Sequence, residues 1–176
     1  MKYKKCDRVK IVESLLPDED YSNLVERSRD LLWYWQTSLP LDQNEILRGG
    51  STFMISDVKD DPYYHDHILS YIQDRIERRV EPIRIYFNAQ ATNFHGSYHT
   101  DEGDVTAILY VNQLPYQHNW GGWTELFDEL TKDQKMIPPI DNNLLLFQSD
   151  ILHRGIGFLC EDAPMRINLT YKLKYV

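Results

Sequence analysis

Two residues that can bind a metal ion, His99 and Asp101, stand two positions apart in the stretch YHTDEGD, just before the apolar run VTAILYV. On an extended segment, residues i and i+2 point to the same face, so both side chains can reach one ion. His153, which follows LLLFQSD later in the chain, is the natural third ligand. Taken singly, the motif is more typical of a polar turn, and a lone histidine more often has a structural role. Together the three residues predict a metal site.

Two histidines and one carboxylate form a facial set of ligands that leaves coordination positions open on the metal. This is the arrangement of non-haem Fe(II) oxygenases, whose open positions admit a co-substrate and dioxygen side by side. We therefore expect His99, Asp101 and His153 to hold a catalytic Fe(II) ion. His65 and His67 are a weaker pair, because they fall in a predicted helix, where i and i+2 diverge by about 200°.

Arg166 opens the run RINLTYKL and is the predicted anion-binding residue. Strand alternation places Ile167, Leu169, Tyr171 and Leu173 on one face, and Arg166, Asn168, Thr170 and Lys172 on the other. An arginine that points inward is an uncompensated buried charge unless an anion meets it. Its planar guanidinium suits a carboxylate, to which it can donate two parallel hydrogen bonds. The alternative is an exposed arginine at the start of a strand, paired with a nearby acid.

The elements that must position these residues change from helical to strand-like along the chain. Apolar residues recur with helical spacing after Asp18, the predicted N-cap, and again from Pro62 to about Val80. After Pro82, short β-type runs alternate with turns rich in Gly, Pro, Asn and Asp. These runs are IRIYFNA, VTAILYVN, WTELFD, NLLLFQ, HRGIGF and RINLTYKL. The pattern predicts an α+β fold, a β-roll with its helices packed outside.

Length predicts one domain over residues 1–176, with a helical part at 1–80 and a β-roll core at 83–176. The chain has no apolar stretch near the roughly 20 residues that span a bilayer and no signal-peptide pattern, so we expect a cytoplasmic protein without membrane contact. Cys6 and Cys160 are the only cysteines, which predicts free thiols and argues against a thiolate zinc site.

The formal net charge of −8 disfavours nucleic acid as a partner, because phosphate binding relies on clustered Lys and Arg. The basic cluster RIERR at 75–79 is better explained as the solvent face of a helix. We expect a peptide, protein or small-molecule substrate instead. Nothing in the sequence indicates the oligomeric state.

Over residues 83–173 the sequence resembles the 2-oxoglutarate- and Fe(II)-dependent dioxygenases, and among them the prolyl 4-hydroxylase type. RIYFNAQATNFHGSYHTDEGDVTAILYVNQ is similar to that family's strand, loop, H-x-D motif and following strand, and GGWTELFD to its Gly-Gly strand. NNLLLFQSDILHRG resembles the strand that leads to the distal histidine, and RINLTYKL the arginine-bearing last strand. The resemblance implies a double-stranded β-helix (jelly-roll) core and a hydroxylase that decarboxylates 2-oxoglutarate to succinate.

The resemblance also implies roles for particular residues. The three iron ligands and the arginine that binds the distal carboxylate of 2-oxoglutarate would be His99, Asp101, His153 and Arg166. Tyr110 matches a family tyrosine whose hydroxyl reaches the same carboxylate, and Tyr86 one near the iron end of the co-substrate; each is otherwise a core tyrosine. Thr106 would share the inward face with Tyr110. Dioxygen is the further co-substrate, and the need for L-ascorbate stays open.

Two departures leave the subfamily open. Nucleic-acid demethylases of the superfamily often carry a second arginine where this chain has Lys172, and collagen-type prolyl hydroxylases tend to use lysine where it has Arg166.

The segments 51–64 and 112–123 are the expected rim loops, with Tyr116, Trp120 and Trp123 available for stacking on a substrate. A peptidyl-proline is the leading substrate, ahead of a free amino acid or another small molecule. Two alternatives place the protein outside the oxygenases: a cupin-like metal-binding protein, and a non-enzymatic β-roll that serves as a binding module.

Overall fold

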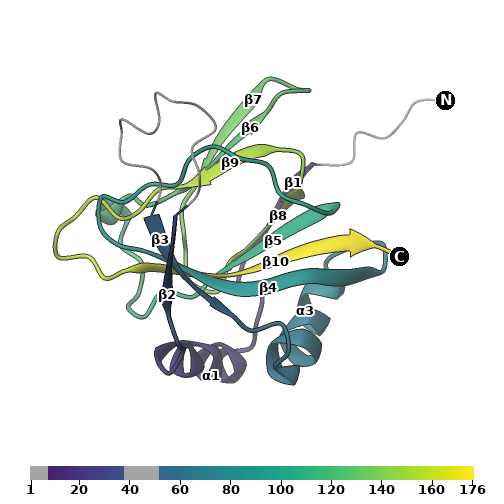
Figure 1. Ribbon diagram of the computed structural model, residues 1–176, viewed down its shortest axis with the longest axis horizontal. Coiled ribbons are helices and arrows are strands. Elements are labelled where there is room, and N and C mark those ends of the chain that lie inside the picture. The colour runs from purple at the N-terminus through teal and green to yellow at the C-terminus, as the bar shows by residue number, and fades with distance from the viewer. Residues whose placement is uncertain (1–7, 38–51) are drawn as a thin grey trace.

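The structure, a computed structural model, describes residues 8–37 and 52–176 (Figure 1). Within them lie a seven-stranded sheet of order β1-β8-β5-β10-β4-β3-β2 and a three-stranded sheet of order β7-β6-β9. The strands are β1 (Val9–Val12), β2 (Tyr34–Thr37), β3 (Thr52–Asp57), β4 (Val80–Gln90), β5 (Val105–Tyr110), β6 (Thr124–Asp128), β7 (Asp133–Ile137), β8 (Leu144–Gln148), β9 (Leu152–Gly155) and β10 (Arg166–Tyr175). The helical elements are α1 (Asp18–Arg29), η1 (Tyr63–Ile68), α3 (Leu69–Gln73) and η2 (His118–Trp120).

Helices cover one face of the large sheet, as the sequence predicted (Figure 1). Leu24 of α1 and Ile72 of α3 share the main core with Ile167 and Leu169 of β10, and all four are at most 3% exposed. Burying one such side chain contributes about 1.5–3 kcal/mol, so this face anchors the sheet. The alternate residues of β10 are left for the opposite face, toward the small sheet.

The predicted helical part at 1–80 also contains strands, because β1, β2 and β3 lie there. β1 pairs with β8 at one edge of the large sheet, while β3 pairs with β4 and with the edge strand β2 on the other side. These short strands form through pairing with residues outside their own segments, and their local periodicity is weak. β7 was also missed, because its residues DQKMI are mostly exposed.

The second helical segment ends at Gln73 and not near Val80 as predicted, and its first part, η1, is a π-helical turn. The Gln73 side chain explains the stop, because its amide donates to the carbonyl of Arg78 and accepts from the N–H of Val80, both at 3.0 Å. This closes a turn that leads directly into β4. At the first helix, Pro17 takes the N-cap position predicted for Asp18.

The turn between the H-x-D motif and β5 is pinned at Gly103 and Asp104. Gly103 has φ +93°, and a Cβ there would lie 2.5 Å from the carbonyl oxygen of Leu173, so only glycine fits without strain. Asp104 donates its N–H to Leu173 at 2.7 Å, and its carboxylate accepts the N–H of Tyr175 at 2.7 Å. The motif is thereby tied to the end of β10.

Among the described residues, no helix has the length and apolar character needed to cross a membrane. The expected cytoplasmic location and the single-domain boundaries remain predictions. Cys160 is a free thiol, as expected, and Cys6 lies outside the described residues.

Candidate active site

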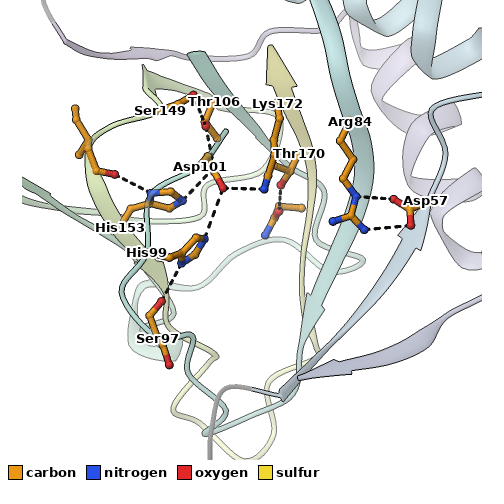
Figure 2. Close-up of polar contacts among 12 residues, drawn as sticks. Asp57, Arg84, Ser97, His99, Asp101, Thr106, Ser149, His153, Thr170 and Lys172 are labelled. Atoms are coloured by element: carbon orange, nitrogen blue, oxygen red, sulfur yellow. Dashed lines mark hydrogen bonds and ion pairs between the residues drawn. The ribbon is translucent and has the colours of Figure 1, made fainter. Parts of the chain in front are cut away.

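The three predicted metal ligands lie together between the two sheets (Figure 2). A pair of backbone hydrogen bonds, of 2.9 and 3.0 Å, joins His99 before β5 to His153 on β9. His153 Nε2 lies 3.3 Å from Asp101 Oδ2, and His99 Nε2 lies 3.8 Å from Asp101 Oδ1. One ligand atom from each residue lies within 4.8 Å of the others.

Both imidazoles are oriented by a backbone carbonyl that accepts from Nδ1. These acceptors are the carbonyls of Ser97 for His99 and Ile151 for His153, each at 2.9 Å. Because a carbonyl only accepts, the proton of each neutral ring lies on Nδ1, and Nε2 keeps its lone pair toward the cluster. Burial lowers the pKa of His99, and the neighbouring His153 lowers it further, which favours the neutral ligand form.

Asp101 is held as a carboxylate whose two oxygens have different neighbours. Its side chain is only 2% exposed, and Oδ2 accepts a 2.8 Å hydrogen bond from the Thr106 hydroxyl. Burial opposes ionisation, but the contact with His153 and the ammonium of Lys172 outweigh it and hold the pKa of Asp101 well below its usual range. Lys172 Nζ forms an ion pair with Oδ1 at 3.0 Å.

This donor set fits a divalent transition metal such as Fe(II). It offers two imidazole nitrogens with free lone pairs and a buried carboxylate. The lone pair of His153 Nε2 lies 3.3 Å from Asp101 Oδ2, a contact that is unfavourable unless a cation binds both atoms. The Lys172 contact was missed at the sequence level, although strand alternation had already placed Lys172 on the inward face.

Arg166 is buried, with 2% of its surface exposed, so the alternative of an exposed strand start is wrong. It donates from Nε to the Gly122 carbonyl at 2.7 Å, from Nη1 to Gln90 Oε1 at 3.0 Å and from Nη2 to Thr124 Oγ1 at 2.7 Å. All three acceptors are neutral, and no carboxylate of the described residues forms an ion pair with it. Burial lowers the pKa of Arg166, the expected effect of a desolvated cation.

Tyr110 and Tyr86 take different positions near the cavity. Tyr110 is fully buried between the sheets, its hydroxyl is 2.8 Å from Thr124 Oγ1, and its ring centre is 5.5 Å from the Arg166 guanidinium carbon. Tyr110 therefore packs against Arg166 and is not part of the described cavity lining. Tyr86 lines the cavity, and burial raises its pKa, so its hydroxyl stays protonated.

The cavity has a volume of about 270 Å³, close to the lower end for small-molecule sites. Its floor consists of four cross-strand pairs of β4 and β10, which we call the polar ladder: Gln90–Arg166, Asn88–Asn168, Tyr86–Thr170 and Arg84–Lys172. The opposite wall carries Tyr98, His99 and His153. The metal cluster thus lies near the Lys172 end of the ladder, and Arg166 lies at the other end.

The expected rim segments have other roles. Residues 52–57 form β3 and not a loop. Tyr116 and Trp120 pack against Phe158, with ring centres 6.1 and 5.3 Å away, and Trp123 donates to Glu125. These aromatic residues lie outside the described lining of the cavity, so their contacts are packing contacts.

Glu125 on β6 links the neighbours of both histidines. Its Oε2 accepts from the Tyr98 hydroxyl and from Arg154 Nε, both at 2.7 Å. Tyr98 precedes His99 in the chain and Arg154 follows His153. Glu125 therefore ties together the two segments that carry the imidazole ligands.

We expect Glu125→Gln to weaken metal binding roughly 10- to 100-fold, the usual effect of removing a partner that orients ligands. Anaerobic titration with Fe(II) measures it. Asp128→Asn is the matched control, because Asp128 lies on the same strand and pairs with Arg8 at 2.8 Å. Equal affinity in the two variants would show that Glu125 does not position the ligands.

A cluster of two histidines and one carboxylate, of which His153 and the Asp101 side chain are buried, faces a buried arginine between two sheets, the arrangement of a non-haem metal site in a β-roll. Residues 84–171, half of the chain, match the family described as the 2OG-Fe(II) oxygenase superfamily. The chain belongs to this superfamily. No curated protein sequence matches the chain.

Solved structures with this fold include two named as prolyl hydroxylases and one with hygromycin B bound. A Pseudomonas putida prolyl-4-hydroxylase aligns with a TM-score of 0.66 and 15% identity over 96% of this chain and 93% of that one. A prolyl hydroxylase in complex with a hypoxia inducible factor peptide fragment, from Trichoplax adhaerens, gives 0.69 and 16%, over 96% and 84%. HygX from Streptomyces hygroscopicus, with nickel, 2-oxoglutarate and hygromycin B bound, gives 0.62 and 8%, over 96% and 83%. The shared fold is the double-stranded β-helix, as predicted.

Proposed function

We propose that this protein is an Fe(II)- and 2-oxoglutarate-dependent dioxygenase that hydroxylates its substrate and converts 2-oxoglutarate to succinate and carbon dioxide. One observation carries the proposal: a single cavity joins a cluster of two imidazoles and a carboxylate to a buried arginine without an acidic partner among the described residues. The uncompensated charge of Arg166 costs free energy. A dianionic co-substrate bound to a metal ion on the cluster would compensate it.

The residues of the cavity divide the work. His99, Asp101 and His153 would hold Fe(II), which together with 2-oxoglutarate supplies the oxidative chemistry when bound. A guanidinium has five N–H donors, and Arg166 uses three of them, so one on each Nη remains for the distal carboxylate. Thr106 keeps the Asp101 carboxylate in one orientation through its hydrogen bond.

Peptidyl-proline is the candidate substrate that the prolyl hydroxylases of this fold support, and a small molecule is the second, supported by HygX. Nucleic acid remains disfavoured by the net charge of −8.

The test is Fe(II)-dependent conversion of 2-oxoglutarate to succinate, without and with a proline-containing peptide, together with anaerobic calorimetry of Fe(II) and 2-oxoglutarate binding. We expect both ligands to bind and succinate to form slowly without substrate and faster with it. Folded protein that binds neither Fe(II) nor 2-oxoglutarate would contradict the proposal, whichever substrate is tried.

A further inference from the structure

Arg84 lines the cavity at the end of the polar ladder closest to the metal cluster. It stands directly across from Lys172, whose ammonium reaches Asp101. Figure 2 shows Lys172 and Thr170 between the cluster and the Arg84–Asp57 pair. Arg84 therefore stands one strand further from the metal cluster than Lys172 does.

The Arg84 guanidinium is held in place with one edge unused. Asp57 accepts from Nε at 2.8 Å and from Nη2 at 3.1 Å, and the Tyr86 ring centre lies 4.4 Å from the guanidinium carbon. The hydroxyl of Tyr34 donates to the same Asp57 carboxylate. Nη1 has no hydrogen-bond partner among the described residues, although the side chain is only 30% exposed.

The charges of the site leave one positive charge at the Lys172 end of the polar ladder. Three cations, Arg84, Arg166 and Lys172, accompany two carboxylates, Asp101 and Asp57, so the excess is one positive charge in a chain of net charge −8. Adding a metal dication and the dianion of 2-oxoglutarate leaves the same excess. Asp57 pairs with Arg84, and Arg166 is assigned to the co-substrate, so the charge that remains when Asp101 binds the metal is that of Lys172, directly across the ladder from Arg84.

A purely structural role explains this arrangement less well. The Arg84–Asp57 contact joins β3 to β4, but an ion pair this exposed contributes little to stability. Its clearer effect is to orient the guanidinium over the Tyr86 ring, with the free Nη1 available to a ligand. In such a partly enclosed site, a fixed positive charge concentrates anions.

We propose that Arg84 binds a carboxylate of the substrate, which is therefore a small carboxylic acid. The inference rests on the proposed function and narrows its substrate class. It favours a free acid, such as an amino acid, over the interior of a peptide, whose amides carry no charge. A carboxylate on a short peptide offers the same chemistry, and the test separates these sources.

The probes are the free amino acids and simple monocarboxylic acids, each paired with its neutral primary amide, and short peptides with free or amidated C-termini. Binding to the Zn(II)- and 2-oxoglutarate-loaded protein is followed by ligand-observed NMR, and succinate formation by the Fe(II) enzyme is measured in parallel. We expect acids to bind and amides not to bind, and Arg84→Gln to weaken acid binding on the order of 10- to 100-fold. Preference for free acids over peptides would identify the source.

The matched control is Arg27→Gln. Arg27 also stacks on a tyrosine, at 4.1 Å from the Tyr63 ring centre, and pairs with Asp61 at 3.8 Å, but it lies on α1, away from the cavity. Its variant should bind the acids as the wild type does. Both variants should keep the affinity for 2-oxoglutarate, which shows that they fold and separates this inference from the proposed function.

Two results would overturn the inference while 2-oxoglutarate still binds: equal binding of acids and amides by the wild type, or equal acid binding by wild type and Arg84→Gln. Failure of every acid to bind would overturn it as well. Loss of 2-oxoglutarate binding in the wild type would remove the proposed function, and this inference with it.

Discussion

Replacement of His153 with alanine is expected to lower Fe(II) affinity by more than about 100-fold and to abolish succinate formation. The expected loss exceeds the 10- to 100-fold effect of removing an orienting partner, because the substitution removes a ligand itself. His153 is 4% exposed, and its Nδ1 is already bonded to Ile151, so Nε2 is committed to the cluster. Anaerobic calorimetry with Fe(II) measures the affinity, and succinate formation gives the activity.

Because a buried alanine also leaves space, Asp101→Asn is the second variant. Asparagine keeps the size of the side chain and an acceptor for the Thr106 hydroxyl, but it loses the charge. His67→Ala is the matched control, because His67 pairs with Asp20 at 2.9 Å on the surface. Retained Fe(II) affinity in both site variants would show that the cluster is not the metal site.

The second large effect is expected at Arg166, where Arg166→Gln should weaken 2-oxoglutarate binding by two to three orders of magnitude. Removing one partner of a buried charge pair costs about 3–5 kcal/mol, because the other charge is left uncompensated. Fe(II) affinity should stay within about threefold of wild type, because Arg166 and Lys172 lie at opposite ends of the polar ladder. Calorimetric titration with 2-oxoglutarate, after Fe(II) loading without oxygen, measures the loss.

Arg166→Lys separates charge from shape. Lysine restores the positive charge but not the planar pair of donors, so we expect partial recovery. Thermal unfolding of each variant checks that the hydrogen bonds lost to Gln90, Thr124 and Gly122 do not unfold the protein. Wild-type affinity for 2-oxoglutarate in Arg166→Gln, in folded protein, would exclude Arg166 as the carboxylate-binding residue.

The main features of the site could be predicted because they depend on strand periodicity. The i, i+2 spacing of His99 and Asp101 and the alternation that turns Arg166 and Lys172 inward are local properties of an extended chain. The structure confirms that alternation and brings the three ligand side chains together. Their binding of Fe(II) and 2-oxoglutarate remains the proposal to be tested.

The contacts that orient the site could not be predicted in this way. Lys172 beside Asp101, Asp57 beside Arg84, and Glu125 between Tyr98 and Arg154 all join residues on different strands or loops. Each depends on strand order and register, which arise only when distant segments pair. The early strands β1, β2 and β3 illustrate the same limit. β1 pairs with β8, far along the chain, while β2 pairs with β3 and β3 with β4, each separated from its partner by a connecting segment.

The sequence by itself therefore determined the chemical groups and the face of the strand on which each one stands, because both follow from residue type and a period of two. The tertiary structure decided which groups meet. It placed Arg166 against neutral acceptors, directed a lone pair of each imidazole toward Asp101, and left Nη1 of Arg84 without a partner among the described residues. These arrangements come from long-range packing, since hydrogen bonds and charges act between atoms that folding brings within a few ångströms.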